Sequence, residues 1–438
     1  MSKPLVAIVG KPNVGKSTFF NKVCGKRISI VSDEPGVTRD RLYGDASWQD
    51  NDFCLIDTGG IQLKSDDILQ LHIKKQAEIA MELSDVILFF VDGKYGLTVE
   101  DIEVAQILRK TNKPLFLVVN KVDNFNSFDA SEFYQLGMDI YPVSSEHMQG
   151  IGDLLDDVVE CFKKSDDVEI EQAVKIAVVG KPNAGKSSLI NKLLGYERAI
   201  VTPIPGTTRD SLDTPLTIND KNYIIIDTAG IRRKRSIEDE SLERYSVMRS
   251  LDAIRRSDVC WVVFDANEDL SEQDVKIAGY VHEQGKPSVI VINKWDLIEK
   301  DTYTVEKFKK KIACDLAFMD YAKSITVSAL SGLRINKLME FTDYVFEKAS
   351  FRATTGILNE VIADAVSLVE PPTKNGKRLK IKYATQPTSN PPTFVLFVND
   401  ADLMHFSYRR YLENTLRKAF SLDGTPIRLF IRSSGEDG

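Results

Sequence analysis

The stretch Val6-Ala-Ile-Val-Gly-Lys-Pro-Asn-Val-Gly-Lys-Ser17 returns 170 residues later as Ile176-Ala-Val-Val-Gly-Lys-Pro-Asn-Ala-Gly-Lys-Ser187. Residues 35–40 and 205–210 keep this offset, as do residues 56–61 and 226–231. Residues 120–123 and 293–296 read Asn-Lys-x-Asp and are 173 positions apart, whereas Ser144 and Ser328 are 184 apart. Because separate stretches recur in the same order, the chain is a duplication. Its second copy is eleven residues longer after the Asn-Lys-x-Asp stretch.

The fold class follows from the apolar pattern between these repeats. Short runs rich in β-branched residues (86–91, 115–119, 259–264 and 288–292) are separated by helix-length segments of mixed polarity. This pattern is typical of βαβ units around a mostly parallel sheet that is buried on both faces. We therefore expect an α/β fold with one doubly wound domain per repeat, at residues 1–162 and 174–350. The charged segment 163–173 between them is expected to be a linker.

The repeat ends near residue 351, and a different pattern follows. Residues 355–369 and 407–420 have helical periodicity, while residues 379–384, 393–398 and 427–431 are expected to form strands. Residues 371–376 are rich in Pro and Gly and are expected to form a turn. We expect residues 351–438 to form a small α+β domain.

Composition excludes several classes of protein. The 438 residues carry 57 Lys and Arg against 64 Asp and Glu, and 43% are hydrophobic, which fits a globular chain rather than a disordered one. No apolar run is long enough for a membrane span, so we expect a soluble protein without a membrane partner. The five cysteines lie far apart, without a Cys-x-x-Cys pair, which favours a reducing cytoplasm over a disulfide scaffold.

Gly-x-x-x-x-Gly-Lys-Ser after an apolar strand is a phosphate-binding loop. Its glycines let backbone N–H groups surround a phosphate at a helix N-terminus. We expect Lys16 and Lys186 to bind phosphate, and Ser17 and Ser187 to bind Mg²⁺.

Asp-Thr-x-Gly follows an apolar strand about forty residues after each loop, where an Asp can hold Mg²⁺ through water and a Gly N–H can meet a γ-phosphate. Thr38 and Thr208 lie between the two motifs and could complete the Mg²⁺ shell only when a γ-phosphate is present, which is the behaviour of a switch. The expected Mg²⁺ ligands are therefore Ser17, Thr38, Asp57, Ser187, Thr208 and Asp227.

The Asn-Lys-x-Asp motif selects the nucleotide base. Its Asp carboxylate can accept hydrogen bonds from both the N1–H and the exocyclic amine of guanine, and adenine offers no such pair of donors. GTP and GDP are thus favoured over ATP. The expected first site comprises Gly10, Lys11, Pro12, Asn13, Val14, Gly15, Lys16, Ser17, Asp57, Thr58, Gly59, Gly60, Ile61, Asn120, Lys121, Val122, Asp123, Ser144 and Ser145. The expected second site comprises Gly180, Lys181, Pro182, Asn183, Ala184, Gly185, Lys186, Ser187, Asp227, Thr228, Ala229, Gly230, Ile231, Asn293, Lys294, Trp295, Asp296, Ser328 and Ala329.

Two tandem G domains with these motifs and a small C-terminal domain resemble the bacterial Der (EngA) family of GTPases over the whole chain. The segments 352–359 and 424–432 also resemble that family. The resemblance implies a KH-like third domain and a role in assembling the large ribosomal subunit through rRNA or pre-ribosomal particles. Two features depart from the pattern: Ser144-Ser145 stands where the family usually has Ser-Ala, and the expected helices and strands at residues 355–431 include no Gly-x-x-Gly loop of the ordinary KH kind.

Hydrolysis is expected to be slow and assisted by a cation. Ile61 and Ile231 occupy the position at which Ras-like enzymes use a Gln to orient water, and an apolar side chain cannot do so. In GTPases that share this hydrophobic residue, the Asn of Pro-Asn-x-Gly-Lys-Ser can coordinate K⁺, and Asn13 and Asn183 match it. K⁺ would stabilise negative charge in the transition state. The alternative is that Asn only stiffens the loop.

Basic charge is concentrated in the C-terminal part. Residues 351–438 carry a net charge of +3, and the rest of the chain carries −10. Such charge can meet RNA phosphates with little sequence preference, although a solvated surface competes as an explanation. Expected RNA contacts are Arg232, Arg233, Lys234, Arg235, Lys377, Arg378, Lys380, Lys382, Arg409 and Arg410. The run 232–235 follows the second Asp-Thr-x-Gly-Ile, so it would respond to the nucleotide unless it is simply a solvated loop.

The sequence favours a monomeric GTP-driven switch on pre-ribosomal RNA. One alternative is an RNA-modifying enzyme with regulatory G domains, but no separate catalytic motif is found. Another is an interaction module that binds nucleotide without useful turnover. The four histidines show no metal-ligand spacing and no nucleophile motif, so they are assigned no role.

Overall fold

The computed structural model of the chain describes residues 3–25, 43–58, 77–78, 80–125, 128–163, 173–195, 199–200, 213–226, 240–299, 303–374 and 376–433. The chain divides into two compact units, residues 1–169 with 238–248 and residues 170–237 with 249–438. The predicted linker therefore lies almost wholly outside the described residues, and the four domain limits remain predictions.

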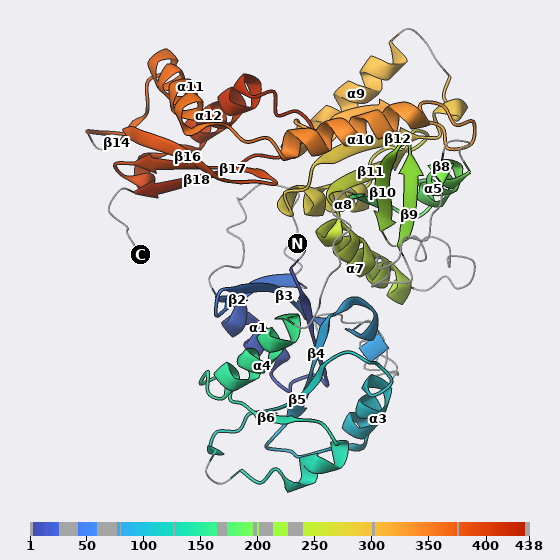
Figure 1. Cartoon of the computed structure of the whole chain (residues 1–438), viewed down its shortest axis with the longest axis vertical. Coiled ribbons are helices and arrows are strands. Elements are labelled where there is room, and N and C mark those ends of the chain that lie inside the picture. Colours follow the sequence, from blue (N-terminus) through green and yellow to red (C-terminus); the bar gives the residue numbers. More distant parts are fainter. Residues whose placement is uncertain are drawn as a thin grey trace. The chain divides into compact units, whose positions relative to one another are not determined.

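The first unit is built on a six-stranded sheet with the order β2-β3-β1-β4-β5-β6. Neighbouring strands are parallel except β2, which is antiparallel to β3. The strands are β1 (Leu5–Gly10), β2 (Tyr43–Trp48), β3 (Asn51–Asp57), β4 (Val86–Asp92), β5 (Leu115–Asn120) and β6 (Ile140–Pro142). The helices discussed below are α1 (Lys16–Cys24), α3 (Val99–Leu108) and α4 (Ile151–Lys163), which flank the sheet (Figure 1).

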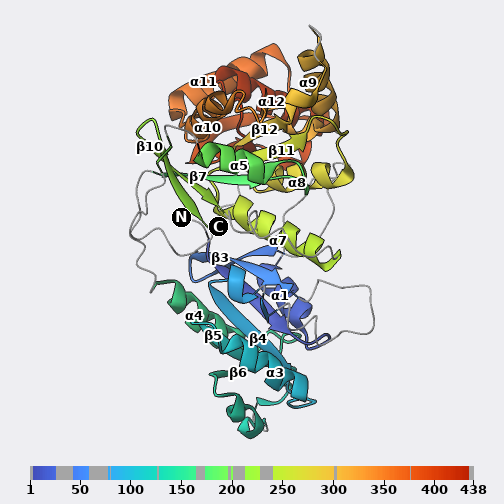
Figure 2. The ribbon, with the colours of Figure 1, turned by 90° about the vertical axis from the view of Figure 1, so that its right-hand side faces the viewer.

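Both faces of the first sheet are buried, as the continuous apolar runs predict. Leu5, Ala7 and Val9 of β1 belong to the core that includes α3, whereas Val6 and Ile8 belong to the core under α1 and α4. This alternation follows from the two-residue period of a strand. Figure 2 shows α3 and α4 beside the strands from a second direction.

The second unit contains a seven-stranded sheet with the order β13-β12-β11-β7-β10-β9-β8. Its strands are β7 (Ala173–Val179), β8 (Ala199–Ile200), β9 (Thr214–Ile218), β10 (Lys221–Ile226), β11 (Val259–Asp265), β12 (Ser288–Asn293) and β13 (Lys323–Thr326). Its helices are α5 (Lys186–Leu194), α8 (Glu272–Glu283), α9 (Thr304–Asp315) and α10 (Ile335–Ala349), and helix α7 (Glu240–Arg256) belongs to the first unit up to residue 248 and to the second from residue 249. Strands β8, β9 and β10 pair antiparallel and the others parallel, so the repeat is doubly wound like the first.

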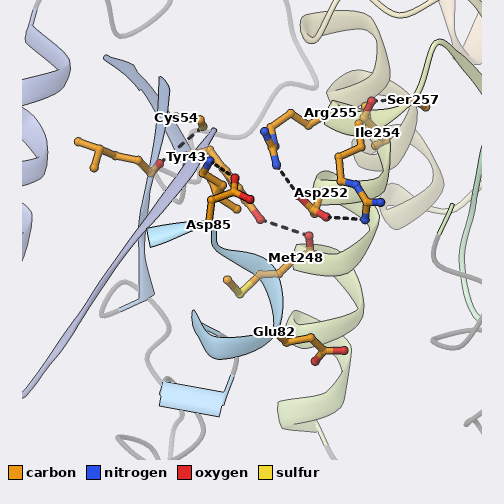
Figure 3. Close-up of polar contacts among 12 residues, drawn as sticks. Tyr43, Cys54, Glu82, Asp85, Met248, Asp252, Ile254, Arg255 and Ser257 are labelled. Carbon is orange, nitrogen blue, oxygen red and sulfur yellow. Dashed lines mark hydrogen bonds and ion pairs between the residues drawn. The ribbon is translucent and has the colours of Figure 1, made fainter. Parts of the chain in front are cut away.

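The same arrangement of side-chain hydrogen bonds lies near the start of β1 and of β7. The Asp85 carboxylate accepts a hydrogen bond from the Leu5 N–H at 2.7 Å, and the Asp258 carboxylate accepts one from the Lys175 N–H at 2.9 Å. The preceding serine closes the end of a helix in each copy, as Ser257 does by donating its hydroxyl to the Ile254 carbonyl (Figure 3). The duplication therefore extends to side-chain contacts that the motifs do not include.

The C-terminal part is a three-stranded sheet covered by two helices. Strand β17 (Pro392–Val398) lies between β16 (Ile381–Ser389), antiparallel to it, and β18 (Arg428–Ser433), parallel to it. Helices α11 (Thr355–Leu368) and α12 (Phe406–Ala419) contribute Leu358, Leu412 and Leu416 to its core. The strand expected at residues 379–384 runs instead from Ile381 to Ser389, and the turn expected at residues 371–376 contains β14 (Thr373–Lys374), which pairs with β15 (Lys377–Arg378).

The C-terminal sheet and the second repeat belong to the same compact unit and share backbone hydrogen bonds. The Gly424 carbonyl accepts from the Ser288 N–H at 2.9 Å, and the Gly424 N–H donates to the Tyr321 carbonyl at 2.7 Å. The Arg417 guanidinium lies 5.1 Å from the centre of the Tyr321 ring and donates to the carbonyls of Leu422 and Thr425. The loop after α12 is thus fixed to the strands of the second repeat.

None of the helices among the described residues is long and apolar enough to cross a membrane.

Candidate nucleotide-binding sites

The phosphate loop of the first repeat joins β1 to α1, and its backbone needs residues that accept positive φ. Gly10, Asn13 and Gly15 have φ values of 150°, 64° and 93°. A Cβ atom at Gly10 would lie 2.3 Å from the Phe90 carbonyl oxygen, and one at Gly15 would lie 2.1 Å from Asn120 Nδ2. Both glycines are therefore required by close approach as well as by backbone conformation.

The second loop, between β7 and α5, repeats this geometry. Gly180, Asn183 and Gly185 have φ values of 150°, 67° and 90°. A Cβ atom at Gly185 would lie 2.2 Å from Asn293 Nδ2. The two loops thus meet the same neighbours in the same backbone conformation.

The loop lysines lie against the carbonyls of their own loop. Lys16 Nζ donates to the carbonyls of Gly10 and Lys11, at 2.7 and 2.5 Å, and Lys186 Nζ makes the equivalent bonds to Gly180 and Lys181. Burial lowers the pKa of Lys16 to about 8, although the nearby Asp57 charge acts in the opposite direction. Both ammonium groups are therefore held at the N-terminus of a helix, where a phosphate would bind.

Ser17 and Asp57, which the sequence predicts to bind Mg²⁺, are brought together. The Ser17 hydroxyl donates to Asp57 Oδ2 at 2.8 Å. A hydroxyl and a carboxylate oxygen are ligands that Mg²⁺ takes, so this pair fits the ion. The neighbouring Thr58 hydroxyl donates to the Ile8 carbonyl at 2.6 Å and fixes the end of β3 on β1.

Asn120 and Asn293 connect the base side of each site to its phosphate loop. Asn120 Nδ2 donates to the Val14 carbonyl at 2.7 Å, and its Oδ1 accepts from the Ser145 N–H at 3.0 Å. Asn293 likewise joins the Ala184 carbonyl to the Ala329 N–H, at 3.0 and 3.1 Å. Sequence reasoning placed these asparagines in the base-binding motif but missed their role in joining three loops.

The lysines of Asn-Lys-x-Asp are oriented by buried carboxylates. Lys121 Nζ lies 2.7 Å from Asp92 Oδ2, and Lys294 Nζ lies 2.5 Å from Asp265 Oδ2. Burial acts to raise the pKa of Asp92, but the hydrogen bond from Lys121 and others from the backbone hold it below its ordinary value. The pKa of Asp265 is lowered in the same way.

Not every predicted site residue faces the site with its side chain. Val122 and Trp295 are buried in the hydrophobic cores, and the Ser144 hydroxyl is buried without a hydrogen-bond partner among the described residues. The Ser328 hydroxyl, in contrast, accepts from the Ser331 N–H at 3.1 Å. Predicted residues outside the described ranges are Thr38, Gly59, Gly60, Ile61, Thr208, Asp227, Thr228, Ala229, Gly230, Ile231, Arg232, Arg233, Lys234 and Arg235.

Basic side chains of the C-terminal part are exposed on the β14–β15 hairpin, on β16 and just before it, and on α12. These are Lys377, Arg378, Lys380, Lys382, Arg409 and Arg410. Arg378 lies 3.5 Å from Glu370 and Arg409 lies 3.1 Å from Glu413, so two of these charges are partly balanced. Arg417, which also lies on α12, is half-buried and donates to the carbonyls of Leu422 and Thr425 in the following loop.

The fold and the two sites define a P-loop protein of the GTPase class with two G domains. Residues 5–121 and 175–294 match the family model described as "50S ribosome-binding GTPase", and residues 352–432 match "KH-domain-like of EngA bacterial GTPase enzymes, C-terminal". The chain belongs to the GTPase Der family.

Two full-length relatives support this assignment. The chain is 53% identical over 441 residues to GTPase Der of Alkaliphilus oremlandii, with all of both chains covered. It is 55% identical over 436 residues to GTPase Der of Ruminiclostridium cellulolyticum, with 99% of both covered. A crystal structure of Aquifex aeolicus Era bound to GDP.AlF4- is 21% identical and covers 60% of this chain and 93% of that one, with a TM-score of 0.32.

Proposed function

We propose that this protein hydrolyses GTP at two sites and acts as a nucleotide-dependent switch in the assembly of the large ribosomal subunit. The observation that carries the proposal is the duplicated site: each copy has a phosphate loop, a lysine held at its carbonyls and an Asn-Lys-x-Asp loop tied to it. The family membership supports the ribosomal role. The protein would work in the cytoplasm as a monomer.

The proposed reaction assigns roles to polar residues of the nucleotide motifs. Lys16 and Lys186 bind phosphate, Asp123 and Asp296 select guanine, and the hydroxyls of Ser17 and Ser187 hold Mg²⁺. Mg²⁺ supplies positive charge at the β- and γ-phosphates. The Ser17–Asp57 hydrogen bond supports this part of the proposal, because it keeps both oxygens at the end of β3.

We propose that turnover is slow and depends on K⁺ at Asn13 and Asn183. In support, the two loops hold this asparagine in the same backbone conformation, with φ values of 64° and 67°. Turnover should therefore fall when Na⁺ replaces K⁺ at constant ionic strength. Equal rates in the two salts would reject the K⁺ role and leave the GTPase proposal standing.

The C-terminal basic side chains would bind rRNA phosphates, and Arg232–Arg235 would respond to the nucleotide in the second site. The exposed positions of Lys377, Lys380 and Lys382 support this interpretation, because phosphate contacts need accessible charge. Charge reversal at residues 232–235 should abolish any nucleotide dependence of RNA binding. An unchanged dependence would assign the run to a solvated loop.

The decisive experiment is co-sedimentation with large ribosomal subunits, with GDP or a non-hydrolysable GTP analogue, at about 0.15 M salt. Binding that requires the analogue would support the switch. Equal binding, or none, in both states would overturn the ribosomal mechanism. Single-turnover hydrolysis at each site separates a GTPase from a module that only binds nucleotide.

A further inference from the structure

The first phosphate loop is tied to helix α3 by a buried ion pair. Lys11, the residue after Gly10, has its Nζ 2.9 Å from Asp101 Oδ2 and donates to the Thr98 hydroxyl at 2.7 Å. The Asp101 side chain is fully buried, and the Lys11 side chain is 17% exposed. The contact therefore joins two segments that are 90 residues apart in the sequence.

The second repeat contains the same contact. Lys181 Nζ lies 3.2 Å from Asp274 Oδ2, and the Asp274 side chain is 1% exposed. Lys181 also lies 2.7 Å from Glu268, at a position where the first repeat has Tyr95. Two copies with different surroundings thus keep the same buried lysine–aspartate pair.

Capping of the helix accounts for only part of this arrangement. The Thr98 N–H and hydroxyl donate to Asp101 Oδ2 at 3.0 and 2.8 Å. The Ser271 N–H and hydroxyl donate to Asp274 Oδ2 at 2.9 and 2.7 Å. Such a capping box is complete without a lysine. In both copies the lysine adds a further donor to the aspartate Oδ2, which already accepts the capping hydrogen bonds. The Oδ1 atoms of Asp101 and Asp274 have no hydrogen-bond partner among the described residues.

Lys11 and Lys181 also connect these ion pairs to the phosphate-binding lysines. The carbonyl of Lys11 accepts the hydrogen bond of Lys16 Nζ, and the carbonyl of Lys181 accepts that of Lys186 Nζ. In each copy the backbone carbonyl of this lysine therefore binds the phosphate-binding ammonium group. Its side chain binds the N-terminus of α3 in the first copy and of α8 in the second. A shift of this residue would move the ammonium group.

We propose that Asp101 and Asp274 are positioning residues for nucleotide binding, acting through Lys11 and Lys181 on the carbonyls that place Lys16 and Lys186. The inference rests on the proposed function, because it assumes that phosphate binds at these lysines. It assigns to the start of α3 and α8 a role that none of the nucleotide motifs includes. Each aspartate serves only the site in its own repeat.

The test compares Lys11→Met, Asp101→Asn and the double variant in the full chain. Affinities for GDP and GTP are measured in an Asp296→Asn background, where guanine binding reports the first site. Each single variant should bind both nucleotides about tenfold more weakly, which lies within the coupling range of contacting residues. The single-turnover rate at saturating GTP should change less than the affinity.

The double variant separates positioning from stability. The double variant removes both charges, so no unpaired buried charge remains. Its thermal unfolding temperature should therefore be higher than that of either single variant. Its nucleotide affinity should stay as low as in the single variants. Affinity that recovers together with stability would overturn the inference, as would wild-type affinity in folded single variants.

Two controls complete the experiment. Lys11→Arg keeps the charge and should restore affinity to within about threefold of wild type, since a guanidinium also pairs with a carboxylate. Asp274→Asn should leave the first site unchanged in the Asp296→Asn background and should weaken the second site in an Asp123→Asn background. If the wild-type protein binds neither GDP nor GTP, the proposed function fails, whereas normal wild-type binding with unaffected variants rejects only the positioning role.

Discussion

Lys94 Nζ lies 2.6 Å from Oδ2 of Asp123, the carboxylate that would select guanine in the first site. The hydrogen bond from Lys94 lowers the pKa of Asp123, and the same bond raises the pKa of Lys94. The second repeat has Asn267 at the equivalent position, where its N–H and Nδ2 donate to Asp265. The two base-binding carboxylates therefore have different neighbours.

Lys94→Gln should tighten GDP binding at the first site by about two- to fivefold, the range expected for loss of an exposed ion pair. The reason is competition, since guanine needs both carboxylate oxygens and Lys94 occupies one. The affinity of the first site can be measured by titration in an Asp296→Asn background. Added salt should shrink the difference between Lys94→Gln and the unsubstituted background, because salt screens the pair.

The reciprocal variant is Asn267→Lys, measured in an Asp123→Asn background. It should weaken GDP binding at the second site by a similar factor. Weaker binding by Lys94→Gln would show instead that the lysine orients Asp123 for the base.

Nucleotide binding at the first site should take up protons at alkaline pH. The pKa of Lys16 is about 8, well below its ordinary value of 10.5, and a bound phosphate anion would raise it by favouring the ammonium form. Above about pH 8, GDP binding should therefore weaken with rising pH. Calorimetry in two buffers of different ionisation enthalpy at pH 8.5 measures the uptake, which Lys16→Met should abolish.

The same shift affects stability with a defined sign. Between about pH 8 and 10.5 the unfolded chain holds the Lys16 proton more firmly than the folded chain. The Lys16 contribution to the free energy of unfolding should therefore rise with pH across this window. A slope of the opposite sign, relative to Lys16→Met, would contradict the lowered pKa.

Asn120→Ala should destabilise the protein by about 2 kcal/mol or more, because it leaves the Val14 carbonyl and the Ser145 N–H buried without their partner. It should also weaken GDP binding, since the phosphate loop loses its support. Thermal unfolding and GDP titration measure the two effects. Asn51→Ala, which removes an exposed hydrogen bond to the Gln49 carbonyl, should change stability by less than about 0.5 kcal/mol.

Gly424→Ala should loosen the connection between the C-terminal sheet and the second repeat. Gly424 has φ 79°, and a Cβ atom there would lie 2.2 Å from Val345 Cγ1. The matched control is Gly376→Ala, because Gly376 has φ 75° but, beyond its chain neighbours, no atom of the described residues lies within 4 Å of the added Cβ. The control should cost about 1–2 kcal/mol in unfolding free energy through backbone strain alone, and Gly424→Ala clearly more. Equal losses would show that the clash is relieved at no cost.

Sequence patterns predicted the fold well where the signal is local. The strands β4, β5, β11 and β12 are buried on both faces, so apolar content alone located them. The phosphate loops were predictable because positive φ and close approach permit few residues. The strand β16 was placed less accurately, because its exposed and irregular stretch continues beyond the apolar residues.

Contacts between distant segments could not be predicted in this way. Thr98-x-x-Asp101 looks like an ordinary helix start, and nothing local to it indicates a lysine from the phosphate loop. The duplication did contain a signal, because Ser271-x-x-Asp274 repeats the pattern at the 173-residue offset. Lys94 gave no such signal, since the second repeat has a different residue there.

The hydrogen bonds of Gly424 affect how easily the C-terminal sheet can be separated from the second repeat. Strand β12 begins at Ser288, which is bonded to Gly424, and ends at Asn293, which supports the second phosphate loop. A force applied to the C-terminal sheet would thus be transmitted along one strand to the second nucleotide site. We therefore expect proteolysis to separate the C-terminal sheet from β12 only slowly, so cleavage near residue 351 should be slow even though the sequence pattern changes there.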